Sequence, residues 1–247
     1  MSFVISYSII KYRKIPFFGV NKKWLIIRGA SGTIALTIFF YTLHNLPLAV
    51  ATTVQYLAPI FTIFFTSILI KEKVRLMQWF FIFFSFTGVI LILLSKYSET
   101  PPGKEEISTF WMGLGIFAAL FSGLAYTAVA KLKLTDKPIT VVLYFPMIAA
   151  PVMTFLCFFD FTMPVGIEWL ILLLIGVTTQ LAQISLTKAL HLESPIIVMP
   201  FKYLGAIYAF LIGYFIFDER LSFIVNIGIV LILAGVILNM LFKKVRT

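Results

Sequence analysis

The side chain with the clearest capacity for chemistry is Lys202, an ammonium group within the apolar stretch Ser194–Arg220. A lysine near the centre of a membrane helix costs about 2.5–3.5 kcal/mol on insertion scales. Lys202 is seven residues from Pro195, the predicted start of its membrane span, which is roughly 10 Å along a helix axis. The lysine side chain can extend over only part of this distance toward the membrane surface. We therefore expect Lys202 to face a polar cavity and to attract an anionic or zwitterionic ligand. The alternative is a structural role, in which the ammonium group caps backbone carbonyls or extends to the surface.

Amide and hydroxyl side chains recur at helical spacing in two other apolar stretches. Gln180 and Gln183 are three residues apart, which places them on one face of a helix. The same face includes Gly176, Thr179 and Thr187, and a second stretch repeats the pattern with Thr52, Gln55, Pro59, Thr62 and Thr66. Amides hydrogen-bond ligands, but they also hold membrane helices together, for about 0.6 kcal/mol on average. Both interpretations stay open for these residues.

An internal repeat connects the lysine with one of these amides. Subtracting 147 from positions near the C-terminus places Lys202 on Gln55 and Tyr203 on Tyr56. The same shift matches three further pairs: His191 with His44, Glu219 with Glu72, and Gly235–Leu238 with Gly88–Leu91. Polar residues at symmetric positions, flanked by the two tyrosines, predict the lining of a shared central cavity. We interpret the repeat as an internal duplication.

The elements that must position these residues are transmembrane helices. Of the 247 residues, 61% are hydrophobic and 12% are charged, and the mean hydropathy is +1.03. A soluble domain has about 25% charged residues, so this composition predicts an integral membrane protein surrounded by a lipid bilayer. Eight apolar stretches are long enough to span the membrane: Trp24–Leu43, Leu48–Ile70, Met77–Leu94, Phe110–Ala130, Ile139–Phe159, Trp169–Thr187, Pro195–Phe217 and Leu221–Phe242.

Basic residues are divided unevenly between the two sets of connections. Sixteen lie on one side and three on the other, and the larger set includes Arg28, Lys71, Lys131, Lys188 and Lys243. Because positively charged connections stay in the cytoplasm, we predict a cytoplasmic C-terminus. The net charge of +10 then sets the orientation of the chain, and no nucleic-acid partner is expected.

The predicted crossings make the two copies of the repeat point in opposite directions. Five spans separate His44 from His191, and an odd number of crossings inverts the second copy relative to the first. Inverted repeats are typical of secondary transporters, whose substrate site lies near the membrane midplane at the interface of the repeats.

The motifs around the repeat resemble those of the EamA-type family of drug/metabolite transporters. The matching positions are Leu57-Ala58-Pro59, Glu72 and Gly88-Val89 in the first copy, and Tyr203, Glu219 and Gly235-Val236 in the second. The resemblance implies an all-α polytopic membrane protein built from two inverted repeats of five helices. It also implies a secondary transporter that moves a small metabolite across the plasma membrane, or bacterial inner membrane, by alternating access. In such a protein we expect the substrate-binding residues to be Lys202, Gln55, Tyr56, Tyr203, Gln180 and Gln183.

The sequence departs from the family pattern in two places. Family members have ten helices, whereas this sequence predicts eight complete helices and an N-terminal stub, Met1–Ile10. We therefore expect residues 1–97 to form a first repeat that lacks its first helix and most of its second, which an upstream extension would supply. Residues 98–109 are then a non-cytoplasmic linker, and residues 110–247 the second repeat. The second copy also has Leu204-Gly205-Ala206 where the pattern has a Leu-x-Pro motif.

Two other classes of function stand as alternatives. A membrane-embedded enzyme is disfavoured, because the sequence has no H-E-x-x-H or G-x-S-x-G motif, no metal-spaced cluster of His, Asp and Glu, and one isolated cysteine, Cys157. A non-transporting membrane subunit is the second alternative. We expect no cofactor and no metal ion, a small-molecule substrate, and leave a homodimer open.

Overall fold

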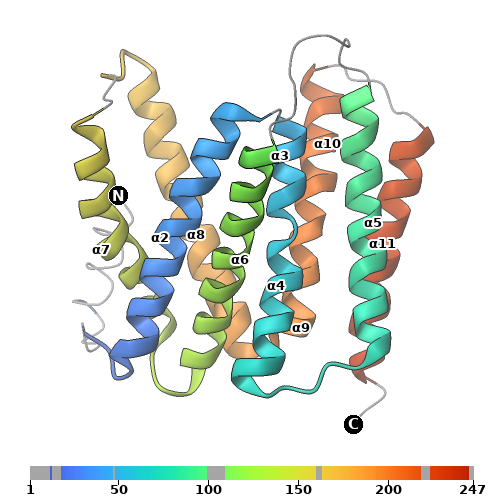
Figure 1. Cartoon of the computed structure of the whole chain (residues 1–247), viewed down its shortest axis with the longest axis horizontal. Helices are drawn as coiled ribbons and strands as arrows, with labels where there is room; N and C mark the ends of the chain where they lie inside the picture. The colour runs from blue at the N-terminus through green and yellow to red at the C-terminus, as the bar shows by residue number, and fades with distance from the viewer. Residues whose placement is uncertain are drawn as a thin grey trace. The chain divides into compact units, whose positions relative to one another are not determined.

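The computed structural model describes residues 12, 18–46, 48–98, 109–159, 163–217 and 223–244. Three predicted features lie outside these ranges: the N-terminal stub Met1–Ile10, most of the 98–109 linker, and Glu219 of the second motif. Within the described ranges the chain is helical and contains no β-strand (Figure 1). The prediction of an all-α membrane protein is confirmed.

Long helices alternate with short helical segments along the chain. In order, the elements are α2 (Lys22–Asn45), α3 (Leu48–Gln55), α4 (Ala58–Phe65), the π-helical η1 (Thr66–Ile70), α5 (Leu76–Ser98), α6 (Thr109–Lys131), η2 (Leu132–Leu134), α7 (Pro138–Cys157), α8 (Glu168–Leu192), α9 (Pro195–Val198), η3 (Met199–Tyr203), α10 (Leu204–Phe217) and α11 (Phe223–Lys244). Five stretches of the described chain are long and apolar enough to cross a membrane: Lys22–Asn45, Ala51–Ile70, Thr109–Leu134, Pro138–Cys157 and Glu168–Leu192.

The helix bounds repeat at the offset that relates the two copies in the sequence. Three pairs of helices share a terminus 147 positions apart: the ends of α2 and α8 at Asn45 and Leu192, the starts of α3 and α9 at Leu48 and Pro195, and the starts of α5 and α11 at Leu76 and Phe223. Helix ends depend on local capping and turn residues rather than on apolar composition alone. Their agreement therefore supports an internal duplication more strongly than matching leucines do.

Two of the predicted spans are interrupted in the structure. The span Leu48–Ile70 divides at a turn between α3 and α4, and Pro195–Phe217 divides at the 3₁₀ segment η3. Pro59 lies in the first turn of α4, directly after the first break, and Pro200 lies within η3, the second break. Proline has no amide hydrogen and its ring displaces the preceding turn, so each one ends the regular hydrogen-bond ladder of the helix before it.

The chain divides into two compact units, neither of which coincides with a sequence repeat. The first unit contains residues 1–34 and 124–194, and the second contains residues 35–123 and 195–247. Each unit therefore takes helices from both copies of the repeat. The repeat boundaries at 97 and 110 remain a prediction about the sequence.

In the second unit, α5 and α11 pack side by side and antiparallel (Figure 1). A methyl group at Gly88 would lie 2.5 Å from the carbonyl oxygen of Gly228, and one at Gly235 would lie 2.8 Å from that of Phe81. A shift of 147 exchanges Gly88 with Gly235 and Phe81 with Gly228, so the two contacts are copies of one another. The helix pair consequently has a local two-fold axis, as an inverted repeat requires.

In the first unit, the α6–α7 connection holds the start of α2. The Asp136 carboxylate accepts hydrogen bonds from the backbone amides of Val20 and Asn21, just before the first turn of that helix. The Tyr144 hydroxyl on α7 donates to the carbonyl oxygen of Phe18 at 2.7 Å. A carboxylate at a helix N-terminus satisfies free amides and interacts favourably with the helix dipole. These bonds determine where α2 begins.

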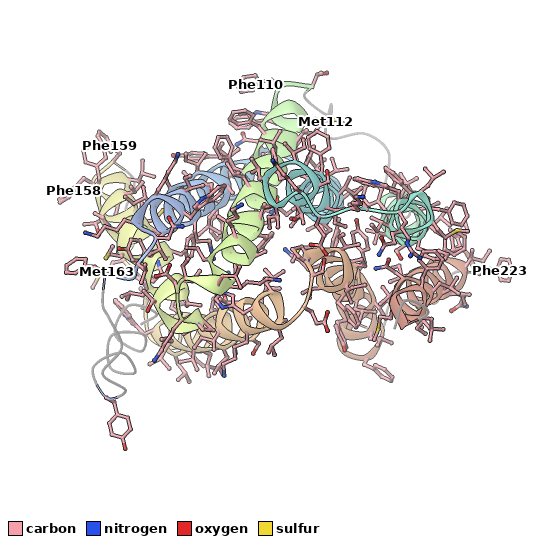
Figure 2. The ribbon with its side chains drawn as sticks, turned by 90° about the horizontal axis from the view of Figure 1, so that it is seen from below. Phe110, Met112, Phe158, Phe159, Met163 and Phe223 are labelled. Atoms are coloured by element: carbon pink, nitrogen blue, oxygen red, sulfur yellow. The ribbon has the colours of Figure 1, made fainter. Side chains whose placement is uncertain are left out.

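Large apolar side chains cover much of the outer surface of the described helices. In α8, Leu170 through Ile175 are all exposed. Figure 2 shows Phe158, Phe159 and Met163 extending outward beyond the end of α7, and Phe223 does so at the start of α11. An apolar surface of this extent is costly in water but suits contact with lipid chains, in agreement with a membrane protein.

Candidate functional site

In the second unit, the two helix interruptions bring a pair of equivalent tyrosines into contact. Tyr56 follows the last residue of α3, and Tyr203 is the last residue of η3. Their ring centroids lie 6.1 Å apart, with a tilt of 59° between the rings. Two copies of the same residue touch only near the axis that relates them, so the tyrosine pair marks the local two-fold axis. Sequence analysis predicted both residues, and the structure brings them together.

Gln55 and Tyr203 each present a buried polar atom without a partner among the described residues. The Gln55 amide nitrogen donates to the Ser122 hydroxyl at 2.9 Å, while its Oε1 atom accepts no hydrogen bond. Tyr203 is 0% exposed, and its hydroxyl likewise has no partner. Leaving a buried polar group unsatisfied costs about 1–3 kcal/mol. Such atoms are rare in folded proteins, and they favour a site where a ligand or water completes the hydrogen bonds.

Lys202 lies in η3, within the interruption itself, and is half-buried. The carbonyl oxygen of Ile196, four residues before Pro200, loses its helical partner at this break. The Asn239 side chain on α11 donates to that oxygen at 2.8 Å. The irregular backbone beside Lys202 is therefore supported by a buried amide, which keeps the break in place inside the membrane.

In the first unit, Gln180 and Gln183 lie on the inner face of α8. Gln180 and Thr187 are buried and Gln183 is half-buried, as expected for one polar face. Thr179 is exposed, so its predicted place on this face is wrong. Thr179 is three residues after Gly176, and a step of three residues turns a helix by about 300°, so its side chain lies about 60° away from that of Gly176. The buried face of α8 is too narrow to include it.

Arg28 is the residue that sequence analysis missed. It was assigned to a cytoplasmic connection, but it lies within α2 and is 3% exposed. Its Nη2 atom donates to Gln183 Oε1 at 3.0 Å, and its guanidinium carbon lies 5.1 Å from the centre of the Phe145 ring. The Nε atom has no hydrogen-bond partner within the described ranges. A charged residue inside a predicted span, six positions after Lys22, was the signal that should have identified it.

The six predicted site residues thus fall into two groups, one in each unit. Gln55, Tyr56, Lys202 and Tyr203 belong to the second unit and surround the helix interruptions. Gln180 and Gln183 belong to the first unit, where Gln183 contacts Arg28. Amide, hydroxyl, ammonium and guanidinium groups are suited to binding a small polar solute, particularly one that carries oxygen anions.

Comparisons with known proteins agree with this architecture. The EamA-like transporter family matches residues 1–94 and 109–241. The pseudopaline exporter CntI of Pseudomonas aeruginosa is 28% identical over 222 residues, which cover 89% of this chain and 75% of the exporter. Solute carrier family 35 member G1 of the mouse is 31% identical over 220 residues, covering 84% of this chain and 59% of that protein. A protein of known crystal structure shares the fold with a TM-score of 0.80 at 17% identity, over 100% of this chain and 86% of its own.

Proposed function

Because this chain belongs to the EamA-like transporter family, we propose that it carries a small anionic or zwitterionic metabolite across the membrane by alternating access. Its relative CntI is named as an exporter of pseudopaline, which supports a small-molecule cargo. We place the chain in the plasma membrane, or the bacterial inner membrane, with a cytoplasmic C-terminus. The excess of basic residues on one side supports this orientation.

The observation that carries the proposal is the pair of interrupted helices at equivalent positions. Transporters with inverted repeats bind their solutes where discontinuous helices meet near the membrane midplane, because the break exposes backbone groups that a continuous helix would use internally. Here the breaks follow α3 and α9, which begin 147 positions apart; Pro59 comes directly after the first break and Pro200 lies within the second. Gln55 and Lys202, also 147 positions apart, stand at these breaks.

The chemistry of the group around the breaks supports an anionic or zwitterionic solute. Lys202 contributes a positive charge, and the two orphaned atoms, Gln55 Oε1 and Tyr203 Oη, contribute an acceptor and a hydroxyl. A solute with a carboxylate and an amine would use both kinds of group. In this proposal Lys202 binds the anion, while Gln55, Tyr56 and Tyr203 orient the rest of the solute.

Alternating access also fits the contact between Tyr56 and Tyr203. In inverted repeats, transport exchanges the conformations of the two copies around a fixed central site. When the two copies exchange conformations, a residue on the axis takes the place of its equivalent in the other copy. Two such residues therefore stay in contact with each other in both states. The tyrosine pair would therefore act as a pivot between α3–α4 and η3–α10, two segments whose breaks already permit bending.

Flux through proteoliposomes tests this proposal directly. The purified full chain is reconstituted into phosphatidylcholine vesicles, and uptake of labelled anionic, zwitterionic, neutral and cationic solutes is measured. We expect saturable uptake of an anionic or zwitterionic solute, with an affinity at least tenfold weaker in Lys202→Gln. Lys188→Gln is the matched control, because Lys188 is exposed on α8. Absence of flux for every solute would favour a non-transporting subunit or an enzyme, and unchanged affinity in Lys202→Gln would exclude the proposed role of this lysine.

A further inference from the structure

Arg28 is a buried cation with no carboxylate beside it among the described residues. Its described partners are the neutral amide oxygen of Gln183, the face of the Phe145 ring and the phenol of Tyr126, which interacts with it electrostatically. No carboxylate lies within ion-pair distance of the guanidinium among the residues that the structure describes. A buried charge of this kind is unfavourable unless it is paired and fully hydrogen-bonded.

One edge of the guanidinium contains a buried donor without a hydrogen-bond partner among the described residues. Nε and Nη2 point in the same direction, and this is one of the edges through which arginine grips a carboxylate with two parallel hydrogen bonds. In Arg28, Nη2 is bound by a single amide oxygen and Nε is unbound. A methyl group at Gly32 would lie only 2.5 Å from Nη1, so the glycine leaves room for that end of the guanidinium. The edge formed by Nε and Nη2 contains the buried donor that a ligand would satisfy.

We propose that Arg28 forms a carboxylate-binding site of its own in the first unit, used by the transported solute in a step separate from its binding by Lys202, and that Gln183 Oε1 holds the guanidinium in its place while no carboxylate is bound. A carboxylate would displace the amide oxygen from Nη2 and would also accept from Nε, so that the buried charge becomes paired. This inference rests on the proposed transport function, because it makes the carboxylate part of the carried solute. It assigns to the first unit a binding residue that the sequence motifs do not indicate.

The burial of Arg28 adds a conformational condition. At 3% exposure, the guanidinium is closed to solvent in the conformation described here. In the proposal, the carboxylate enters when alternating access opens the packing of α2 against α7 and α8. In the closed state, the hydrogen bond to Gln183 gives the arginine a partner. Because the Gln183 amide is neutral, its hydrogen bond is weaker than one from a carboxylate, and an incoming anion can displace it.

Binding is tested separately from transport by thermal unfolding of the full chain in phosphatidylcholine nanodiscs, whose lipid headgroups contain no carboxylate. The probes are pairs of acid and amide with nearly the same shape: glutamate with glutamine, aspartate with asparagine, and succinate with succinamide. Inorganic phosphate serves as an anion of different geometry. We expect at least one acid, and not its amide, to raise the unfolding temperature. An effect from phosphate alone, from amide and acid equally, or from no probe would overturn the inference.

Three variants and one control variant connect the acid response to this edge of the guanidinium. Gln183→Glu places a permanent carboxylate beside Nη2, so we expect a well-folded protein whose affinity for the acid is at least tenfold weaker. Gln78→Glu makes the same change on α5, where the side-chain oxygen accepts a hydrogen bond from the Arg75 amide, and should leave the response intact. Arg28→Lys should retain part of the affinity, and Arg28→Gln none. An acid response that survives in both Gln183→Glu and Arg28→Gln would overturn the inference.

The two proposals fail in different ways. Acid binding in nanodiscs without flux in vesicles would contradict transport and leave the Arg28 site standing as a binding site. If only neutral or cationic solutes are transported and no acid stabilises the protein in nanodiscs, the chain is still a transporter. That result would contradict both a carboxylate on the solute and the binding role of Arg28.

Discussion

Tyr56 and Tyr203 are 147 positions apart in the chain, and their ring centroids lie 6.1 Å apart in the structure. The same offset separates Ser85 from Ile232, where the serine hydroxyl lies 3.5 Å from the isoleucine carbonyl oxygen. Two independent pairs of equivalent residues therefore meet their own copies. Both pairs lie within the second unit, where the two copies of the repeat are in contact.

The buried hydroxyl of Tyr203 gives a prediction that separates stability from function. Tyr203→Phe removes an oxygen that is 0% exposed and has no hydrogen-bond partner among the described residues. We expect the variant to be as stable as the wild type or more stable by about 1–2 kcal/mol, since removing an unsatisfied group relieves its desolvation cost. If the hydroxyl contacts the solute, uptake should fall at least fivefold. Thermal unfolding and vesicle flux measure the two effects, and a destabilised variant would show that the hydroxyl has a structural partner.

The close approach of α5 and α11 predicts that both glycines at their contact are required. Gly235→Ala would place a methyl group 2.8 Å from the Phe81 carbonyl oxygen, and Gly88→Ala would place one 2.5 Å from the Gly228 carbonyl oxygen. Each substitution should lower the unfolding free energy by about 1–3 kcal/mol, because the helices must separate. Gly113→Ala is the control, since no atom of the described part of the chain lies within 4 Å of the added methyl group. Equal unfolding temperatures for the three variants would contradict the described packing.

The support of the second helix break predicts coupling between Asn239 and Pro200. Asn239→Leu removes the donor to the Ile196 carbonyl oxygen, and this should cost about 1–3 kcal/mol of stability. Pro200→Ala restores a backbone amide four residues after Ile196, which can take over the bond. In a double-mutant cycle, Asn239→Leu should therefore cost less in the Pro200→Ala background. Additive effects would mean that Asn239 acts independently of the break.

The anchor at the start of α2 predicts a stability effect in the first unit. Asp136→Ala leaves the amides of Val20 and Asn21 without their acceptor and should destabilise the protein by about 1–2 kcal/mol. Gly19, at φ +62°, leaves no room beside Asp136 for a side chain, so Gly19→Ala should have a similar effect. Glu168→Ala removes a single bond to the exposed amide of Val165 and should cost less. Reversal of this order in unfolding measurements would contradict the anchoring role.

Part of the candidate site was accessible from sequence because polarity in an apolar chain is informative. Lys202 and the amides Gln55, Gln180 and Gln183 stand out against residues that lipid would accept. Arg28 was misassigned although it has the same signal, because its position near Lys22 and Lys23 made it look like part of a loop. Positive charge near a helix end has two explanations, orientation and burial, and only the packing of α2 distinguishes them.

The sequence by itself determined the membrane class, the order of the apolar segments and the 147-residue repeat. These follow from composition and from residue identity, which act locally and do not depend on which helices are neighbours. The tertiary structure decided the rest: the axis through Tyr56 and Tyr203, the contact of Gly88 with α11, and the pairing of Arg28 with Gln183. Each of these contacts joins residues that are far apart in the chain. Because lipid chains are as apolar as the helix interfaces, the hydrophobic pattern of a membrane helix does not indicate which of its faces packs against which neighbouring helix.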